Sequence, residues 1–127
     1  MTEVVLDASA VLALVREEPG AEAVAGIVSG AVISTVNVSE AVAKLVQKGA
    51  PSEGAREIVF SLPLRMVDFD AEQAAAAGQM WPRGRAAGLS FGDRACLALA
   101  ETLNLCAVTA DRRWKSFDAK VEIRYIR

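Results

Sequence analysis

The chain contains no histidine and only two cysteines among its 127 residues. Without histidine it cannot form a Ser-His-Asp triad or a Cys-His pair, and it lacks the imidazole ligands of many zinc sites. Cys96 and Cys106 lie in apolar runs and have no cysteine partner at metal-ligand spacing, so both are predicted to be small core residues. Any chemistry must therefore come from carboxylates, hydroxyls, cations or a bound metal ion.

Long apolar runs and a basic N-terminus are also missing. No apolar run approaches the roughly 18 residues that a membrane-spanning helix needs. The N-terminal stretch MTEVVLDASA is acidic early and lacks the basic start of a signal peptide. We therefore expect a cytoplasmic protein without membrane contact, and its length predicts a single domain over residues 1–127.

The net charge is only −2, but it is unevenly distributed. Residues 83–115 carry six basic and three acidic side chains, whereas residues 1–82 carry five basic and 11 acidic ones. A basic rim around an acidic, metal-binding pocket would suit a polyanionic substrate. A solvated basic surface explains the same pattern, and charge alone favours that simpler interpretation.

Apolar periodicity alternates between strands and helices along the chain. This alternation predicts an α/β domain of three layers, α/β/α, with a mostly parallel sheet of about five strands. Asn37 is expected to cap the third helix, and the segment WPRGRAAG around Pro82 is expected to be a loop or kink. Strands are expected at residues 3–7, 31–36, 65–69, 105–109 and 121–126, and helices at 8–17, 21–29, 37–48, 52–62, 71–81 and 91–103.

Four acidic residues lie where the chain passes from a strand or loop into a helix: Asp7, Glu40, Asp93 and Asp111. In open α/β sheets such positions converge at the carboxyl ends of the strands. Four carboxylates in one place repel one another unless a cation joins them, and Mg²⁺ prefers oxygen ligands of this kind. Each acid alone could instead cap a helix or interact with the helix dipole.

These four segments resemble the PIN-domain family of metal-dependent ribonucleases, and its VapC-type toxins in particular. The matching segments are VVLDASAVLALV, NVSEAVAKL, LSFGDRACLALA and AVTADRRW, in the family's order and spacing over essentially the whole chain. The family's acidic positions fall on Asp7, Glu40, Asp93 and Asp111, which the resemblance assigns to catalysis and metal binding. Its hydroxyl positions fall on Ser9 and Thr109.

The resemblance implies hydrolysis of RNA with Mg²⁺ or Mn²⁺, a small cognate antitoxin as partner, and a homodimer. A metal ion held by carboxylates can generate hydroxide from a bound water and offset charge on the phosphate. Basic residues near the last two acids could contact the RNA backbone, which positions RNA without reading its sequence. These candidates are Arg83, Arg85, Arg94, Arg112, Arg113 and Lys115.

Other interpretations remain open from the residues alone. The same fold could serve as a catalytically inactive PIN-like binding module, or as a PIN nuclease in RNA processing that is not a toxin. A receiver-type signalling domain would need adjacent acids after the first strand, and a haloacid-type phosphohydrolase would need a second aspartate in DASAV. Neither feature is present in the sequence.

Overall fold

In the computed structural model, which describes residues 3–127, the chain forms one five-stranded sheet. All neighbouring strands are parallel, in the spatial order β3-β2-β1-β4-β5. The predicted parallel sheet of about five strands is confirmed, although each strand is shorter than expected. The strands are Val4–Leu6 (β1), Val32–Ser34 (β2), Arg65–Val67 (β3), Cys106–Thr109 (β4) and Ile123–Tyr125 (β5).

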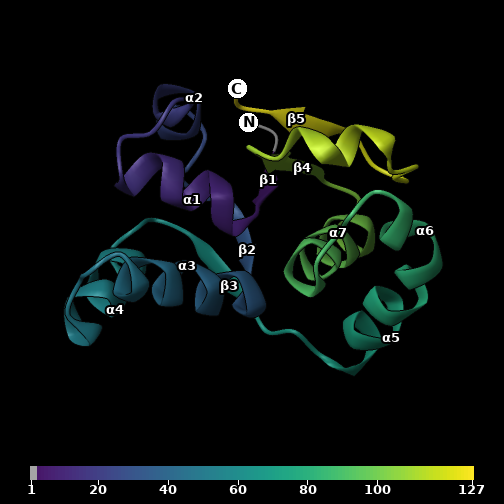
Figure 1. Cartoon of the computed structure of the whole chain (residues 1–127), viewed down its shortest axis with the longest axis horizontal. Helices are drawn as coiled ribbons and strands as arrows, with labels where there is room; N and C mark the ends of the chain where they lie inside the picture. The colour runs from purple at the N-terminus through teal and green to yellow at the C-terminus, as the bar shows by residue number, and fades with distance from the viewer. Residues whose placement is uncertain (1–2) are drawn as a thin grey trace.

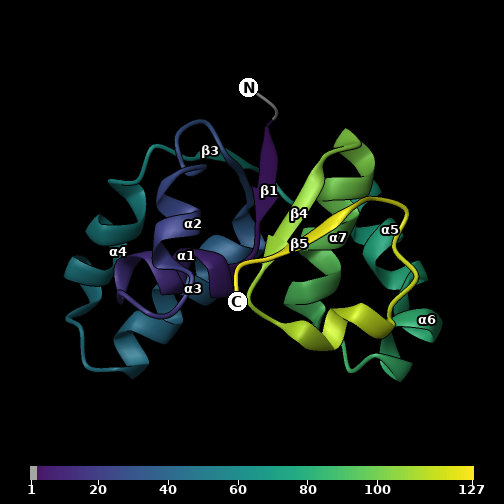
Figure 2. The same cartoon turned by 90° about the horizontal axis from the view of Figure 1, so that it is seen from above.

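Helices cover both faces of this sheet, as the α/β/α class requires. Figure 1 shows α1 to α4 on one side and α5 to α7 on the other, and Figure 2 shows the same division around β1, β4 and β5. The helices are α1 (Ala8–Val15), α2 (Ala21–Ala25), α3 (Thr35–Gln47), α4 (Ser52–Phe60), α5 (Ala71–Gln79), α6 (Trp81–Ala86) and α7 (Phe91–Leu103), with a 3-10 helix η1 (Arg112–Ser116).

Two hydrophobic clusters, one on each face, hold the layers together. Successive side chains of a strand point to opposite faces, so Val4 and Leu6 of β1 pack in the cluster under α1–α4. Val5 between them packs in the other cluster, with Leu97 of α7 and Trp114 of η1. All five of these side chains are at most 3% exposed. The central strand is therefore buried on both faces, which explains its continuous apolar sequence.

Two features differ from the sequence-based expectation. The expectation that Asn37 caps the third helix is wrong, because the Ser34 hydroxyl at the end of β2 accepts the Val36 N–H at 3.2 Å and starts α3 earlier. The segment around Pro82, expected to be a loop or kink, forms the short helix α6, which a break at Met80 separates from α5. Proline is tolerated in the first turn because the N–H that it lacks has no helical partner there.

The two layers of helices meet at the carboxyl ends of the strands, where α3 contacts α7. Asn37, now inside α3 and 1% exposed, donates an amide hydrogen bond to the Gly92 carbonyl of α7 at 3.0 Å. This junction brings the acid of α3 next to the acid of α7. Within residues 3–127, none of the helices combines the length and the apolar character that crossing a membrane demands.

Candidate functional site

A pocket of about 210 Å³ opens beyond the carboxyl ends of β1 and β4. Each of its acids comes from a different segment: Asp7 after β1, Glu40 from α3, Asp93 from α7 and Asp111 after β4. The other lining residues are Ala8, Ser9, Leu12 and Lys44. The parallel sheet thus gathers four carboxylates that lie up to 104 positions apart in the sequence.

Asp7 is the most deeply buried of the four acids, with only 4% of its surface exposed. Its Oδ1 accepts the Ala10 N–H at 2.9 Å and the Ser9 hydroxyl at 2.7 Å, and its Oδ2 accepts the Thr109 hydroxyl at 2.6 Å. Burial raises the pKa of Asp7 to about 6, although these hydrogen bonds act in the opposite direction. No cation in residues 3–127 forms an ion pair with it.

The hydroxyls of Ser9 and Thr109 tie this acid to the end of β4. Ser9 Oγ accepts the Ala110 N–H at 2.9 Å, and Thr109 Oγ1 accepts the Asp111 N–H at 3.0 Å. Each hydroxyl therefore donates to Asp7 while accepting from the loop that carries Asp111. The two hydroxyls fix the position of one acid relative to the other.

Glu40 lies at the α3–α7 junction, in the second turn of α3. Its Oε1 accepts the Asn37 amide at 2.7 Å, and its carboxyl rests against Gly92. A Cβ at position 92 would overlap the Glu40 carboxyl, so only glycine leaves room for it. Desolvation raises the pKa of Glu40, and the nearby charge of Asp93 acts in the same direction.

Asp93 has a structural role as well as a place in the pocket. Ser90 and Asp93 form a capping box for α7: the Ser90 hydroxyl accepts the Asp93 N–H at 3.2 Å, and Asp93 Oδ2 accepts the Ser90 N–H at 2.9 Å. Among the described residues, Oδ1 of Asp93 takes part in no hydrogen bond. Desolvation raises the pKa of Asp93.

Within residues 3–127, Asp111 is the one acid of the pocket that forms an ion pair. The Arg113 guanidinium donates to both carboxylate oxygens, with Nη2 at 2.6 Å from Oδ2 and Nε at 3.0 Å from Oδ1. These hydrogen bonds hold the pKa of Asp111 below its usual value. Asp111 also caps η1 by accepting the Arg113 N–H at 2.9 Å.

The chain matches a known protein family. A family model described as the PIN domain matches residues 4–120 of the chain. The chain belongs to the PIN-domain family. No curated protein matches its sequence.

Solved structures of related fold agree with this assignment. The DNA-bound VapBC complex from Salmonella typhimurium matches with a TM-score of 0.78 and 19% identity, over 100% of both chains. A toxin-antitoxin complex from Klebsiella pneumoniae matches at 0.75 and 14%, over 98% of both. VapC20 of Mycobacterium tuberculosis, a sarcin-ricin loop cleaving toxin, matches at 0.75 and 17%, over 91% of this chain and 97% of its own. At such identities the likeness concerns the fold.

The four carboxylates of this PIN domain differ in how they are engaged. No three acidic or cysteine side chains in residues 3–127 gather closely enough, as they stand, to hold one metal ion. The hydrogen bonds give the reason, because Glu40, Asp93 and Asp111 each turn toward a local partner. The donor set nevertheless fits a hard divalent cation, since it consists of oxygens and three of the four carboxyl pKa values are raised.

None of the six basic candidates lines the pocket within the described chain, and only Arg113 binds one of its acids. Long side chains find other partners: Arg83 donates to the Asp118 carbonyl, Arg94 to the Ala77 carbonyl and Arg112 to the Arg127 carbonyl. Arg85 lies over Trp81, and Lys115 lies near the ring of Tyr125. Lys44 does line the pocket, but it was not among the candidates from the sequence. Its position one turn after Glu40 on the same helix face could have indicated it.

Proposed function

We propose that this PIN-domain protein is a metal-dependent endoribonuclease that hydrolyses RNA phosphodiester bonds with Mg²⁺ or Mn²⁺. The observation that carries the proposal is a single pocket lined by four carboxylates, of which the most buried, Asp7, has no cationic partner in residues 3–127. A buried carboxylate without a cation is costly, and a divalent ion would relieve that cost. The family assignment agrees with this chemistry.

Each acid of the pocket has a proposed role at the metal site. Asp7, Asp93 and Asp111 would hold the ion, and Glu40 would complete the set directly or orient the attacking water. When bound, the ion lowers the pKa of a water molecule and offsets charge on the phosphate. Ser9 and Thr109 donate to Asp7 and so favour its ionised form, the form that binds a cation. To hold the ion, Asp111 would have to give up its hydrogen bonds to Arg113.

Asparagine substitutions test this proposal. Asp7→Asn or Asp93→Asn should abolish RNA cleavage while the protein stays folded, because a neutral amide holds Mg²⁺ poorly. Asp70→Asn is a matched control: Asp70 caps α5 by accepting the Gln73 N–H at 2.9 Å, as Asp7 caps α1 through Ala10 at 2.9 Å. Cleavage of a labelled RNA and circular dichroism give the readouts. Parental cleavage by the Asp7→Asn variant would refute the mechanism.

We further propose that the enzyme is the toxin of a toxin-antitoxin pair, active as a homodimer and held by a small antitoxin. Several solved structures of the same fold are, by their descriptions, toxin-antitoxin complexes. Exposed apolar side chains on α3 and α4, namely Val46, Ile58 and Phe60, offer a surface for an amphipathic partner helix.

Growth assays test the partner. Expression of the chain alone should slow growth, and co-expression with the small protein of the neighbouring gene should restore it. The Asp7→Asn variant should be harmless and still bind that partner. If the unaltered chain cleaves RNA but is harmless when expressed alone, it is a nuclease of RNA processing and not a toxin.

A catalytically inactive binding module is the second candidate, because Asp7 and Asp111 cap helices and Asp93 completes the capping box of α7. Caps alone require no metal ion. RNA binding and thermal stability that are independent of divalent ions, together with no cleavage, would favour this alternative.

A further inference from the structure

We propose that Lys44 and Phe91 position the substrate on two sides of the carboxylate pocket, Lys44 by binding a phosphate and Phe91 by stacking on an unpaired base. The assignment rests on the proposed nuclease function, and it gives that function two positioning residues that the sequence motifs do not include.

Lys44 lies on α3, one turn beyond Glu40, and lines the pocket together with the four acids. It is the only cation in that lining among the residues that the structure describes. Its side chain is exposed, and within residues 3–127 it forms no ion pair with the carboxylates nearby. An acidic pocket repels a polyanion, so an unpaired ammonium at its rim would supply the compensating contact.

Phe91 is the first residue of α7, two positions before Asp93, and its side chain is 51% exposed. It does not line the pocket itself, but it adjoins Gly92, against which the Glu40 carboxyl rests. Phe69 holds the ring from one side in an edge-to-face contact, with centroids 5.6 Å apart and planes at 83°. The Arg94 guanidinium lies 5.9 Å from the ring centroid. A ring that is already held in place loses little freedom when a base stacks on it.

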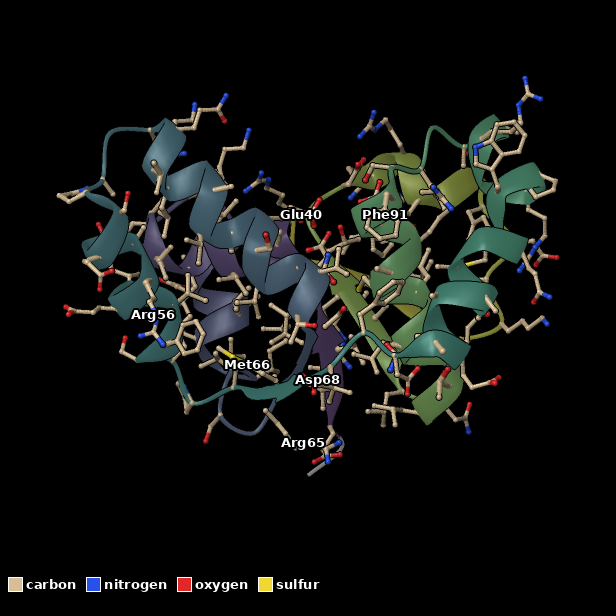
Figure 3. The ribbon with its side chains drawn as sticks, turned by 90° about the horizontal axis from the view of Figure 1, so that it is seen from below. Glu40, Arg56, Arg65, Met66, Asp68 and Phe91 are labelled. Atoms are coloured by element: carbon tan, nitrogen blue, oxygen red, sulfur yellow. The ribbon has the colours of Figure 1, made fainter. Side chains whose placement is uncertain are left out.

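The two residues lie on different sides of Glu40. The Phe69 N–H donates to Thr35 Oγ1 at 3.1 Å, so the Phe69–Phe91 pair lies near the start of α3. Lys44 lies near the end of the same helix, with Glu40 between. Figure 3 shows Glu40 on α3 and Phe91 on α7, on either side of the junction of the two helices. An RNA strand that crosses the pocket would therefore meet the Phe91 ring first, then the carboxylates and then the Lys44 ammonium.

Three other large aromatic side chains are less suited to this role. Trp81 is 50% exposed, but it belongs to α6, which contributes no residue to the pocket lining. Phe60 is 48% exposed on α4, which likewise contributes no residue to that lining. Trp114 is fully buried in the core. Among the described residues, Phe91 is the exposed aromatic side chain nearest in sequence to a pocket acid.

Binding measurements in the Asp7→Asn background test Lys44 without cleavage of the probe. We would follow the anisotropy of a short, labelled, single-stranded RNA over a range of salt concentrations. Lys44→Gln should weaken binding and reduce the slope of log K against log salt by about 0.7, the value for one lost phosphate contact on a single strand. Lys44→Arg should restore the slope. Lys48→Gln, at the C-cap of α3 and outside the pocket lining, is the matched control and should leave the slope unchanged.

Phe91 is tested by comparing an oligoadenylate with an abasic oligonucleotide of the same length. The Asp7→Asn protein should prefer the oligoadenylate by about 5- to 150-fold, the range for one stacked base. Phe91→Ala should lose this preference without a lower affinity for the abasic probe, and Phe91→Trp should keep the preference. Phe60→Ala is the control of similar exposure and should behave like the parent.

Specific results would overturn the assignment. Equal salt slopes for Lys44→Gln and Lys48→Gln would remove Lys44 from the site. If Phe91→Ala lowers the affinity for both probes equally, or changes the oligomeric state in sedimentation, Phe91 belongs to a protein interface. A parent protein that shows the expected binding pattern but cleaves no RNA would refute the proposed nuclease function and leave the positioning roles in place.

Discussion

Asp7 combines two properties that rarely coexist in a resting protein, deep burial and the absence of a cationic partner in the described chain. Three hydrogen bonds favour its ionised form, and burial opposes it more strongly. The balance leaves a carboxyl whose pKa of about 6 lies near neutral pH. Such a group is ionised at pH 7 but only at a cost in stability, which a bound cation would offset.

The stability of the metal-free protein should therefore depend on pH through Asp7. Between about pH 4 and pH 6 the folded protein holds more protons on this group than the unfolded chain, so the free energy of unfolding should fall as pH rises, by about 3 kcal/mol for this group. Above pH 6 this contribution levels off.

Urea unfolding in EDTA over this pH range gives the measurement. Asp7→Asn should remove this fall of about 3 kcal/mol in the free energy of unfolding, and the variant should be more stable than the parent at pH 7. The exposed cap variant Asp70→Asn should keep the parental profile. Parallel pH profiles for the parent and Asp7→Asn would contradict the assignment.

The sequence predicted some side chains of the site better than others. Short acids at strand ends have few places to go, and the structure brings all four to one pocket, although their catalytic roles remain predictions. Long basic side chains could not be placed from the sequence, because their partners are carbonyls and rings contributed by the tertiary fold. Arg94, directly after Asp93, reaches the Ala77 carbonyl of α5 and not the pocket.

At the scale of elements, the junction of α3 and α7 decides whether Glu40 reaches the pocket. The helices approach closely because position 92 carries no side chain, and the Asn37 amide joins them by bonding both the Glu40 carboxyl and the Gly92 carbonyl. The sequence could not indicate this contact, since it placed Asn37 outside the helix as a cap. The competing hydroxyl of Ser34 three residues earlier explains the error.

Gly92→Ala should therefore displace the Glu40 carboxyl and lower RNA cleavage by about 10- to 100-fold, the range for residues that support a metal site. In a Glu40→Ala background the added methyl meets no carboxyl. In that background Gly92→Ala should stabilise α7 by up to about 1 kcal/mol, because alanine has a higher helix propensity than glycine. Unfolding free energies of the four proteins of this double-mutant cycle provide the measurement. The same energetic effect of Gly92→Ala in both backgrounds would rule out the contact.

At the scale of the whole molecule, the sequence predicted the layered architecture because periodicity and alternation of elements report directly on it. The sheet order and the junction of the two helix layers needed the structure, since they depend on contacts distant in sequence. The pocket joins acids from four segments, two that follow strands and two within helices. A ligand that binds all four should therefore stabilise the entire fold.

Thermal melts test this coupling. Mg²⁺ or Mn²⁺ at about a hundredfold excess over the dissociation constant should add about 2.7 kcal/mol and raise Tm relative to EDTA. Sodium chloride at matched ionic strength controls for charge screening. Asp93→Asn should lose most of the shift. Identical melting temperatures with and without the divalent ion would argue against a metal site.

The two outermost strands of the sheet have a further consequence, for colloidal behaviour. β3 and β5 each leave one backbone row unpaired within the described sheet, which could template aggregation with other chains. Both strands are only three residues long, and each carries an exposed arginine, Arg65 or Arg124. Short edges that carry a charged side chain disfavour pairing with a second copy, so we expect little edge-to-edge fibre growth even at high concentration.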